Sequence, residues 1–436
     1  MKNTKRIAII GGGCSGLAAA VTLASARPDL ELTLFEERAT FGGRTRSFVD
    51  TVSGDLIDNG QHLLMGCYTS TLEYLKTIGS EHLLRSSPYL EIPFYKKDIG
   101  YTGSLKASGS LPAPFHLLLG LLGSDILGGF EKFAACRLGV VLQKIDVASI
   151  PSELTCASFL AIHKQPESLI KILWEPIILA TLNTSVQLAS AWVFVTVMQT
   201  IFFKKASYSN ILFPTTGLSS LLVDPAVDFL IKNGTSLQTG RRIDDIDLDT
   251  TSVTLYEGES NLGRFDKIIM ASAPWPGWLT KISPMQGALE FSPIVNLYLW
   301  VDSVLFTQPI NALINTSLQW CFPKPTHYGK QLLACTISAA DSLAELEPKE
   351  IVRMAEQELR SLFPNRTFSI VHSQVIKEKR ATYRLSPSTQ AYRPSMSSAH
   401  PSVFIASDLA QNELPFTIEG AIRNGQEAAK NVLKSM

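Results

Sequence analysis

The glycine-rich segment GGGCSG, residues 11–16, restricts the possible folds of this chain more than any other feature. It follows an apolar run at residues 6–10 and opens a helix-forming stretch at residues 15–24, and a second apolar run covers residues 31–35. Gly11, Gly13 and Gly16 let the backbone turn tightly and approach a pyrophosphate, whose charge meets the helix N-terminus at Cys14 and Ser15. The segment therefore predicts a βαβ unit that binds a dinucleotide.

A carboxylate follows the second predicted strand at the distance expected for ribose recognition. Glu36 lies about 20 residues after Gly16, where an acid can accept hydrogen bonds from ribose hydroxyls and repels a 2′-phosphate. Glu37 is the neighbouring alternative, because the exact register of the strand end is open. We therefore predict that one of these two carboxylates contacts the ribose.

The composition narrows the class of protein. A chain of 436 residues favours two domains. With 39 basic and 39 acidic residues, the chain has no net positive charge, which disfavours a nucleic-acid-binding protein. Apolar residues make up 45% and charged residues 18%, which favours a hydrophobic ligand or a membrane face. The six cysteines are scattered without CxxC spacing, so we expect neither a metal site nor a disulfide framework. No secretory apolar region precedes residue 6, which predicts a cytoplasmic protein.

A second glycine motif, FGGRTRS at residues 41–47, resembles the GGR segment of the flavin-containing amine oxidase and phytoene desaturase superfamily. In physical terms, Gly43 brings backbone close to the dinucleotide, and Arg44 supplies a positive charge for phosphate or ribose oxygens. The resemblance implies FAD as the cofactor. It also implies that the GRRIDDI segment, residues 240–246, places the backbone of Ile243 near the adenine.

The resemblance continues in the C-terminal segment VFIASDLAQNELPFTIEGAIRNGQEAA. In that superfamily the strand ends at an acid that bonds the ribityl chain, and Asp408 occupies this position here. Ser407 stands where the family more often has glycine. Thr417 and Ile418 then open a helix, predicted over residues 417–434, whose free N–H groups and dipole stabilise negative charge on a reduced flavin.

The segment DNGQHLLMG, residues 58–66, clusters polar groups with glycines. In the superfamily this segment leads back under the flavin ring, which implies that Gly60, Gln61 and His62 lie at the flavin. A capping box of Ser70 and Glu73 is expected to start the following helix. His62 is the first candidate for proton transfer, with a histidine satisfied by backbone carbonyls as the equally weighted alternative. Asp58 and Glu413 are further candidates.

The predicted fold class is α/β, with a Rossmann-like FAD-binding domain interleaved with a mixed α+β substrate domain. We assign residues 1–75, 206–287 and 391–436 to the FAD-binding domain, and residues 76–205 and 288–390 to the substrate domain. The short β-rich runs at residues 240–274 are expected to return to the FAD-binding sheet.

Combining DNGQHLLMGCY with EPIILATLNTSVQLASAWVFVTVM at residues 175–198 and EKRATY at residues 378–383, the chain resembles the hydroxysqualene dehydroxylase family. This resemblance implies reductive dehydroxylation of hydroxysqualene to squalene, with hydride from N5 of reduced FAD to an allylic cation. It also implies a hydrophobic isoprenoid substrate, and an electron donor that is a reduced nicotinamide nucleotide or an external reductase. A carotenoid or polyprenoid desaturase is the main alternative, and an amine oxidase is a further one.

Such a cation must be kept from water, so the site requires an apolar tunnel. Residues 176–203 contain no charged side chain, and five residues of this stretch are predicted to line the tunnel or, alternatively, to pack in a buried helix: Leu188, Trp192, Val195, Phe202 and Phe203. The apolar stretch at residues 111–130 is interrupted by prolines, glycines and Asp125. We interpret it as a peripheral membrane contact at the cytoplasmic face of the inner membrane, with a buried helix pair as the alternative.

Overall fold

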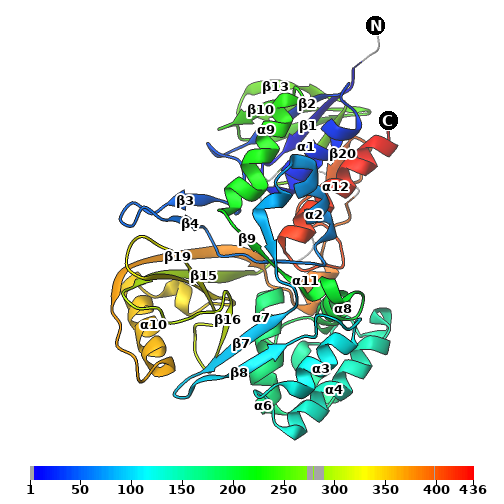
Figure 1. Cartoon of the computed structure of the whole chain (residues 1–436). Coiled ribbons are helices and arrows are strands. Elements are labelled where there is room, and N and C mark those ends of the chain that lie inside the picture. The colour runs from blue at the N-terminus through cyan, green and yellow to red at the C-terminus, as the bar shows by residue number, and fades with distance from the viewer. Residues whose placement is uncertain (1–3, 273–277, 279–288, 397) are drawn as a thin grey trace.

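The computed structural model describes residues 4–272, 278, 289–396 and 398–436. It contains two bodies, one above the other in Figure 1. The upper body is built on a five-stranded parallel sheet in the order β10-β2-β1-β14-β20. Its strands are β1 (Arg6–Ile10), β2 (Glu31–Glu36), β10 (Ser236–Thr239), β14 (Lys267–Met270) and β20 (Val403–Ile405).

Alternation along β1 explains why this sheet is covered on both faces. Ile7 and Ile9 pack into a core with α1 (Cys14–Ala26), α9 (Asp224–Lys232) and α12 (Ile418–Lys434). Ala8 and Ile10 point to the opposite face, because successive side chains of a strand alternate in direction. A parallel sheet with both faces covered is typical of a Rossmann-like α/β domain, and the predicted fold class is confirmed.

The β-rich region after Gly240 divides between two sheets. Strand β14 joins the parallel sheet as expected, but β11 (Asp245–Asp249), β12 (Ser252–Glu257) and β13 (Ser260–Phe265) form an antiparallel sheet of their own. Its apolar side, including Val253, Leu255 and Phe265, covers the second face of the parallel sheet. The expectation that the whole region returns to the parallel sheet was therefore wrong for these three strands. Pro274, at the end of that region, lies outside the described residues.

The lower body is built on a seven-stranded sheet in the order β19-β15-β18-β17-β16-β7-β8. Its strands are β7 (Glu91–Lys96), β8 (Gly100–Lys106), β15 (Phe291–Val301), β16 (Asn311–Ile314), β17 (Trp320–Lys324), β18 (Gln331–Ile337) and β19 (Ile370–Tyr383). Helix α10 (Pro348–Leu362) covers one face of this sheet, where it packs against Leu297 and Leu299 of β15. Tyr298 and Trp300 point to the other face, into a helical layer.

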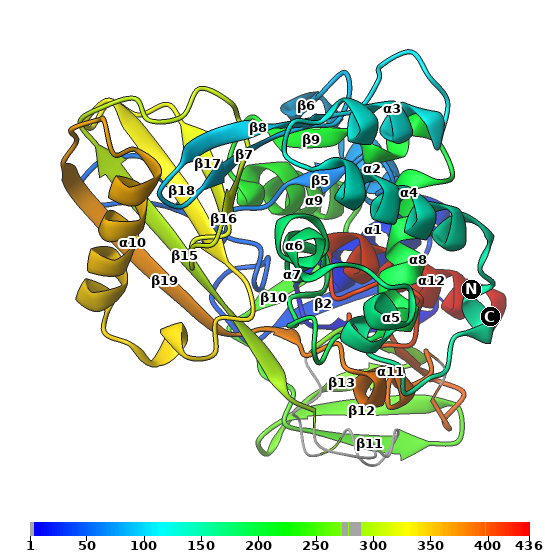
Figure 2. The same ribbon diagram turned by 90° about the horizontal axis from the view of Figure 1, so that it is seen from below.

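The helical layer lies at lower right in Figure 1 and is seen from below in Figure 2. It consists of α3 (Phe115–Gly123), α4 (Gly129–Lys144), α5 (Cys156–Ile162), α6 (Glu167–Leu169), α7 (Glu175–Leu182) and α8 (Ala191–Phe202). Helix α8 is the centre of this layer because it is buried almost all round. Helix α11 (Pro387–Ala391) leads back to the upper body.

Short strands connect the two bodies. The hairpin of β3 (Ser47–Val49) and β4 (Leu56–Asp58) leaves the upper sheet, and β9 (Ile211–Pro214) pairs with β5 (Leu64–Met65) and β6 (Leu84–Ser86). The chain therefore passes between the bodies several times. The predicted division into domains stays a prediction, and its boundary at residues 287 and 288 lies outside the described residues.

In the part of the chain that the structure describes, no helix has both the length and the apolar character needed to cross a bilayer. All six cysteines are free thiols, and five of them are buried.

Candidate functional site

Two glycine loops lie side by side above the N-terminus of α1. Gly42 N donates to Gly12 O over 2.8 Å, and Gly13 and Gly42 form a parallel bridge. Gly11 and Gly42 have φ values of +104° and +108°, which side chains rarely tolerate. A Cβ on Gly13 would meet nothing within 4 Å, whereas one on Gly16 would lie 1.8 Å from Gly11 O. The loop is therefore packed closely at Gly16, whereas the space beside Gly13 is free of protein atoms, as backbone contact with a phosphate requires.

Glu36 is held at this loop. One of its carboxylate oxygens accepts from Gly12 N at 2.7 Å and the other from Arg38 N at 2.9 Å, and the side chain is buried. Glu37 is exposed. Ile243 lies nearby, because Arg241 N donates to Glu36 O, and the Ile243 carbonyl accepts from Trp278. Of the two predicted ribose ligands, the geometry therefore favours Glu36.

The first turn of α1 is packed against the end of β20 and against α12. Ser15 Oγ donates to the Ala406 carbonyl, so this hydroxyl proton already has a partner within the protein. A Cβ on Gly425 of α12 would lie 2.1 Å from Ser15 O, which explains why this helix has a small residue there. Cys14 Sγ lies 3.2 Å from Thr45 Oγ1, and burial raises the pKa of this thiol, so it stays protonated. Neither side chain therefore offers a charge to a ligand, and the contact of Cys14 and Ser15 with the dinucleotide through their backbone stays a prediction.

Arg44 and Asp408 form an ion pair that joins the two ends of the chain. The guanidinium also donates to Ala381 O at 2.6 Å. The neighbouring Asp408 carboxylate raises the pKa of Arg44, so the guanidinium stays charged at neutral pH. The resemblance implied that both residues contact the cofactor, and in the structure each also orients the other.

A buried arginine that the sequence analysis missed shapes the loop after Asp408. The Arg393 side chain donates to carbonyl oxygens of Asp408, Leu409, Ala410, Asn412 and Leu414 at 2.8–3.3 Å. Its guanidinium also stacks over the Phe416 ring, 4.9 Å from the centroid. Burial lowers the pKa of Arg393 to about 10, which still leaves it charged at neutral pH. This one side chain therefore fixes the path from β20 to α12.

Helix α12 begins where it was predicted to begin, and its first turn has a partner that was not predicted. Thr417 Oγ1 accepts from Gly420 N at 3.2 Å, and Ile418 is the first helical residue. Glu419, only 2% exposed, accepts from Ser70 N, Thr71 N and Thr71 Oγ1 at 2.7–3.0 Å. These donors belong to the first turn of α2 (Thr69–Ile78).

The predicted capping box of Ser70 and Glu73 was therefore wrong. Helix α2 has no side-chain cap of its own, and Glu419 from the far end of the chain takes that function. Satisfying buried amide groups with a carboxylate contributes on the order of 1–3 kcal/mol. No local signal in the sequence indicates this pairing.

The loop at residues 58–66 approaches the same region. Asp58 accepts from Ser47 Oγ at 2.7 Å and from Leu218 N at 2.9 Å, and it faces Lys324 Nζ at 3.6 Å. These contacts commit Asp58 to holding the loop. Gly60 packs on Asn296 of β15, where a Cβ would lie 2.9 Å from the amide nitrogen. Glu413, the other alternative proton donor, is exposed.

His62 Nδ1 lies 2.7 Å from Gly60 O. Because a carbonyl only accepts, Nδ1 carries a proton, and a neutral His62 presents an unprotonated Nε2. The side chain keeps accessible surface, yet desolvation by the surrounding protein lowers the pKa of His62. The alternative in which backbone carbonyls satisfy His62 therefore holds for Nδ1. The unprotonated Nε2 of the neutral ring can still take up a proton.

The five predicted tunnel residues differ in their surroundings. Val195 is fully buried in the core of the helical layer, and Leu188 is 46% exposed. The remaining three are partly buried against that core: Trp192, Phe202 and Phe203. Core packing therefore accounts for Val195, and the lining role of this set stays a prediction.

Buried polar atoms beside these loops fit a bound polar group. Among the described residues, Gln61 Oε1, Ser272 Oγ and Tyr383 OH are buried without a hydrogen-bond partner. The Ser272 backbone borders Gly11, and Tyr383 interacts electrostatically with Arg44 and Asp408. Glycine loops, a ribose-type acid, a cation and a helix N-terminus make up the donor set that a dinucleotide needs. Gly11, Gly13, Glu36, Arg44, Asp408 and Thr417 would hold it.

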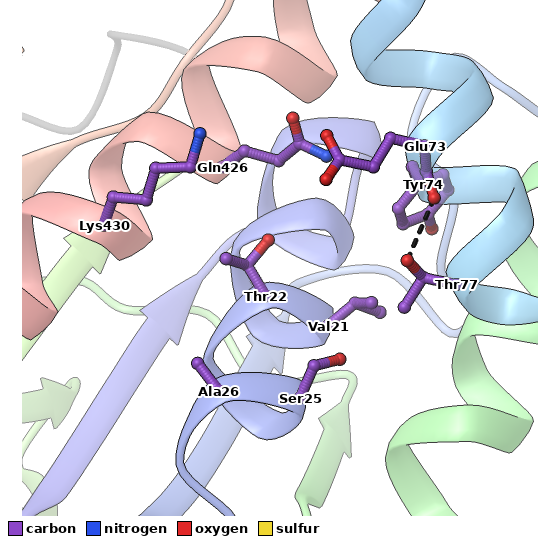
Figure 3. A pocket seen from close by; sticks show the side chains of 9 residues that line it. All are labelled: Val21, Thr22, Ser25, Ala26, Glu73, Tyr74, Thr77, Gln426 and Lys430. Atoms are coloured by element: carbon purple, nitrogen blue, oxygen red, sulfur yellow. Dashed lines mark hydrogen bonds between the residues drawn. The ribbon is translucent and has the colours of Figure 1, made fainter.

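A groove of about 260 Å³ lies elsewhere, between α1, α2 and α12 (Figure 3). It is lined by the later turns of these helices, including Thr22, Glu73 and Lys430. The glycine loops meet the opposite, N-terminal end of α1, so this groove is not part of the candidate site.

Comparison with known proteins agrees with this geometry. The family model described as flavin containing amine oxidoreductase matches residues 14–433. The chain is 27% identical over 428 residues to a hydroxysqualene dehydroxylase from Zymomonas mobilis, covering 97% of each chain. It is 23% identical over 486 residues to a probable zeta-carotene desaturase from Synechococcus elongatus, covering 99% of each.

Among solved structures, cyclohexylamine oxidase from Brevibacterium oxydans superposes with a TM-score of 0.69 at 17% identity, covering 99% of each chain. At that identity the likeness concerns the fold. The superfamily and the FAD cofactor that the motifs implied are confirmed. The chain belongs to the flavin containing amine oxidoreductase family and is an FAD-dependent oxidoreductase.

Proposed function

We propose that this protein reductively dehydroxylates hydroxysqualene to squalene. The observation that carries the proposal is the similarity to a hydroxysqualene dehydroxylase over 97% of both chains, which leaves no large segment unmatched. FAD in its reduced form supplies the hydride that replaces the hydroxyl. The substrate is then a hydrophobic isoprenoid, in keeping with an apolar and charge-poor chain.

The protein has to protect an allylic cation from water. The helical layer supports this role, because residues 176–203 carry no charged side chain and α8 is buried almost all round. An apolar wall offers no nucleophile to a carbocation and excludes the water that would rehydrate it. The same feature disfavours an amine oxidase, whose cationic substrate needs polar or aromatic partners.

Loss of the hydroxyl requires a proton, and His62 is proposed to deliver it. Because Nδ1 is bonded to Gly60 O, donation from Nε2 requires the imidazolium form. Desolvation lowers the pKa of His62, so this form grows only as the pH falls below the ordinary histidine range.

We therefore expect the turnover rate to rise as the pH falls through the lowered pKa of His62, and we expect His62→Gln to remove that pH dependence. General acid catalysis is worth about 10²–10⁴-fold, which sets the expected loss in kcat at the acidic end. The measurement is the pH profile of kcat in both proteins, with the surface variant His82→Gln as control. An unchanged acidic limb in His62→Gln would exclude His62 as the donor.

A polyprenoid desaturase is the second candidate, favoured by the 23% identity to a probable zeta-carotene desaturase over nearly the whole chain. It would run the cofactor in the opposite direction, from oxidised to reduced. The two functions also differ in partner: a dehydroxylase consumes electrons from a reduced nicotinamide nucleotide or an external reductase, whereas a desaturase passes electrons on.

Product analysis distinguishes them. The holoprotein is incubated without oxygen either with hydroxysqualene and a reductant, or with a polyene and an electron acceptor. Squalene in the first mixture and no new double bond in the second is the expected result. Desaturated polyene without any squalene would replace the proposed function by its alternative.

A further inference from the structure

Helix α3 exposes its apolar face and buries its polar one, which is the reverse of an ordinary surface helix. Its apolar positions Phe115, Leu118, Leu119 and Leu122 follow the i, i+3, i+4, i+7 spacing of one helix face, and all four are exposed. Its buried positions are His116 and Gly120. A helix in contact with water would place the leucines inside and the histidine outside, so the outer face of α3 is suited to a medium other than water.

Contacts on the inner side fix this orientation. His116 Nε2 lies 3.1 Å from Ser209 Oγ, and a Cβ on Gly120 would lie 2.4 Å from Lys106 O. Rotating the helix to bury its leucines would break the His116 bond. It would also press a large side chain against the backbone of β8. The exposed apolar face is therefore built into the packing of the body.

Helix α4 extends the same surface. Figures 1 and 2 both show α4 beside α3 at the rim of the helical layer. Phe130 and Phe133, one turn apart near its start, are each 68% exposed, and Val140 lies further along the same face. We call the exposed residues Phe115, Leu118, Leu119, Leu122, Phe130 and Phe133 the α3–α4 surface. Large exposed apolar side chains gathered on two neighbouring helices mark an interaction site.

The charges around the α3–α4 surface are mostly positive. Lys132 Nζ donates to Leu122 O at 2.8 Å, which places an ammonium between the two apolar stripes. Arg137 and Lys144 are exposed further along α4, and α3 carries no charged residue. Glu131 is partly buried and accepts from Ser168 Oγ, so Asp125 in the connecting loop is the one exposed acid of residues 111–144.

We propose that the α3–α4 surface docks on a lipid bilayer, with the six apolar side chains in the acyl boundary and the basic residues at anionic phosphates. Exposed phenylalanine and leucine beside lysine and arginine is the pattern of interfacial helices. A second copy of this chain fits less well. A two-fold contact through the same patch would set Lys132 and Arg137 near their own copies, with little acid to pair them. The proposal stands whether or not the reaction proposed above is correct.

The test uses the full-length holoprotein and sedimented vesicles of phosphatidylcholine with about one-third phosphatidylglycerol. The wild type is expected to sediment with the vesicles. The double variant Phe130→Ser/Phe133→Ser is expected to bind at least about tenfold more weakly, since burial of a phenylalanine side chain is a major apolar contribution. Raising the salt concentration is expected to weaken, but not abolish, wild-type binding, because salt screens only the basic contacts.

The matched control is Ile99→Ser/Ile231→Ser, which removes two apolar side chains that are each 60% exposed and lie outside α3 and α4. It is expected to bind vesicles like the wild type. Equal melting temperatures of all three proteins establish that the changes are local. Wild-type protein that stays in the supernatant, or a double variant that binds as well as the wild type, would overturn the proposal. So would vesicle-free dimerisation that the double variant abolishes.

Discussion

Replacing Gly16 by alanine is expected to produce a protein that purifies with less than about a tenth of the FAD of the wild type. The added Cβ would lie 1.8 Å from Gly11 O, a backbone atom that can move only if the whole glycine loop moves. Overpacking of this kind costs roughly 1–3 kcal/mol or more, which corresponds to about a tenfold to hundredfold loss of affinity at the loop.

Gly425→Ala is expected to have a similar effect from the other side. Its Cβ would lie 2.1 Å from Ser15 O, so it pushes α12 away from the first turn of α1. The control is Gly139→Ala in α4, where a Cβ meets nothing within 4 Å and the helix should gain about 0.5–1 kcal/mol. The measurements are flavin content per chain and FAD affinity by fluorescence quenching. Full FAD occupancy in both Gly16→Ala and Gly425→Ala would show that the loops do not hold the cofactor.

Replacing Arg393 by lysine is expected to destabilise the protein and weaken FAD binding, although the positive charge is kept. Five carbonyl groups converge on the guanidinium, and a lysine ammonium has three donors and no planar fork. Carbonyls left buried without partners cost about 1–3 kcal/mol each before relaxation, so a total near 3–5 kcal/mol is expected. The loop that carries Asp408 would then lose its fixed path, and with it the ion pair to Arg44.

The free energy of unfolding and the FAD affinity are measured on the same preparations. Arg360→Lys serves as the matched control, because Arg360 is exposed and pairs with Glu356 one turn away, a contact worth about 0.3–0.5 kcal/mol. A variant Arg393→Lys that is as stable as Arg360→Lys and binds FAD normally would contradict the organising role of Arg393.

The parts of the fold that rest on local signals could be predicted from the sequence. The apolar run at Arg6–Ile10 became β1 over those same residues, and the predicted helix start at Ser15 differs from the observed one by one residue. The positions of Gly11, Gly16 and Thr417 were recoverable because turn geometry and helix capping depend on neighbouring residues. Local chemistry and tertiary structure agree at these points.

The parts that rest on distant pairings could not be predicted. Glu419 caps α2 from a position about 350 residues away in sequence, where the local pattern of Ser70 and Glu73 suggested a self-contained cap. In the sequence, Arg393 looks like a surface arginine in a polar loop. It is buried only because residues 408–414 fold around its guanidinium and direct their carbonyl groups at it. For the stretch that contains α3, the sequence left a membrane contact and a buried helix pair open, and only the tertiary contacts of His116 and Gly120 show that its apolar face points outward.

The central claim is that this fold delivers hydride from its bound cofactor to a hydrophobic allylic alcohol. Its most direct test is a single anaerobic turnover, in which stoichiometrically reduced holoprotein is mixed with hydroxysqualene and no other electron source. We predict that the absorption of oxidised flavin returns as squalene forms, with one squalene for each flavin reoxidised. Flavin that stays reduced while hydroxysqualene remains unchanged would contradict the account.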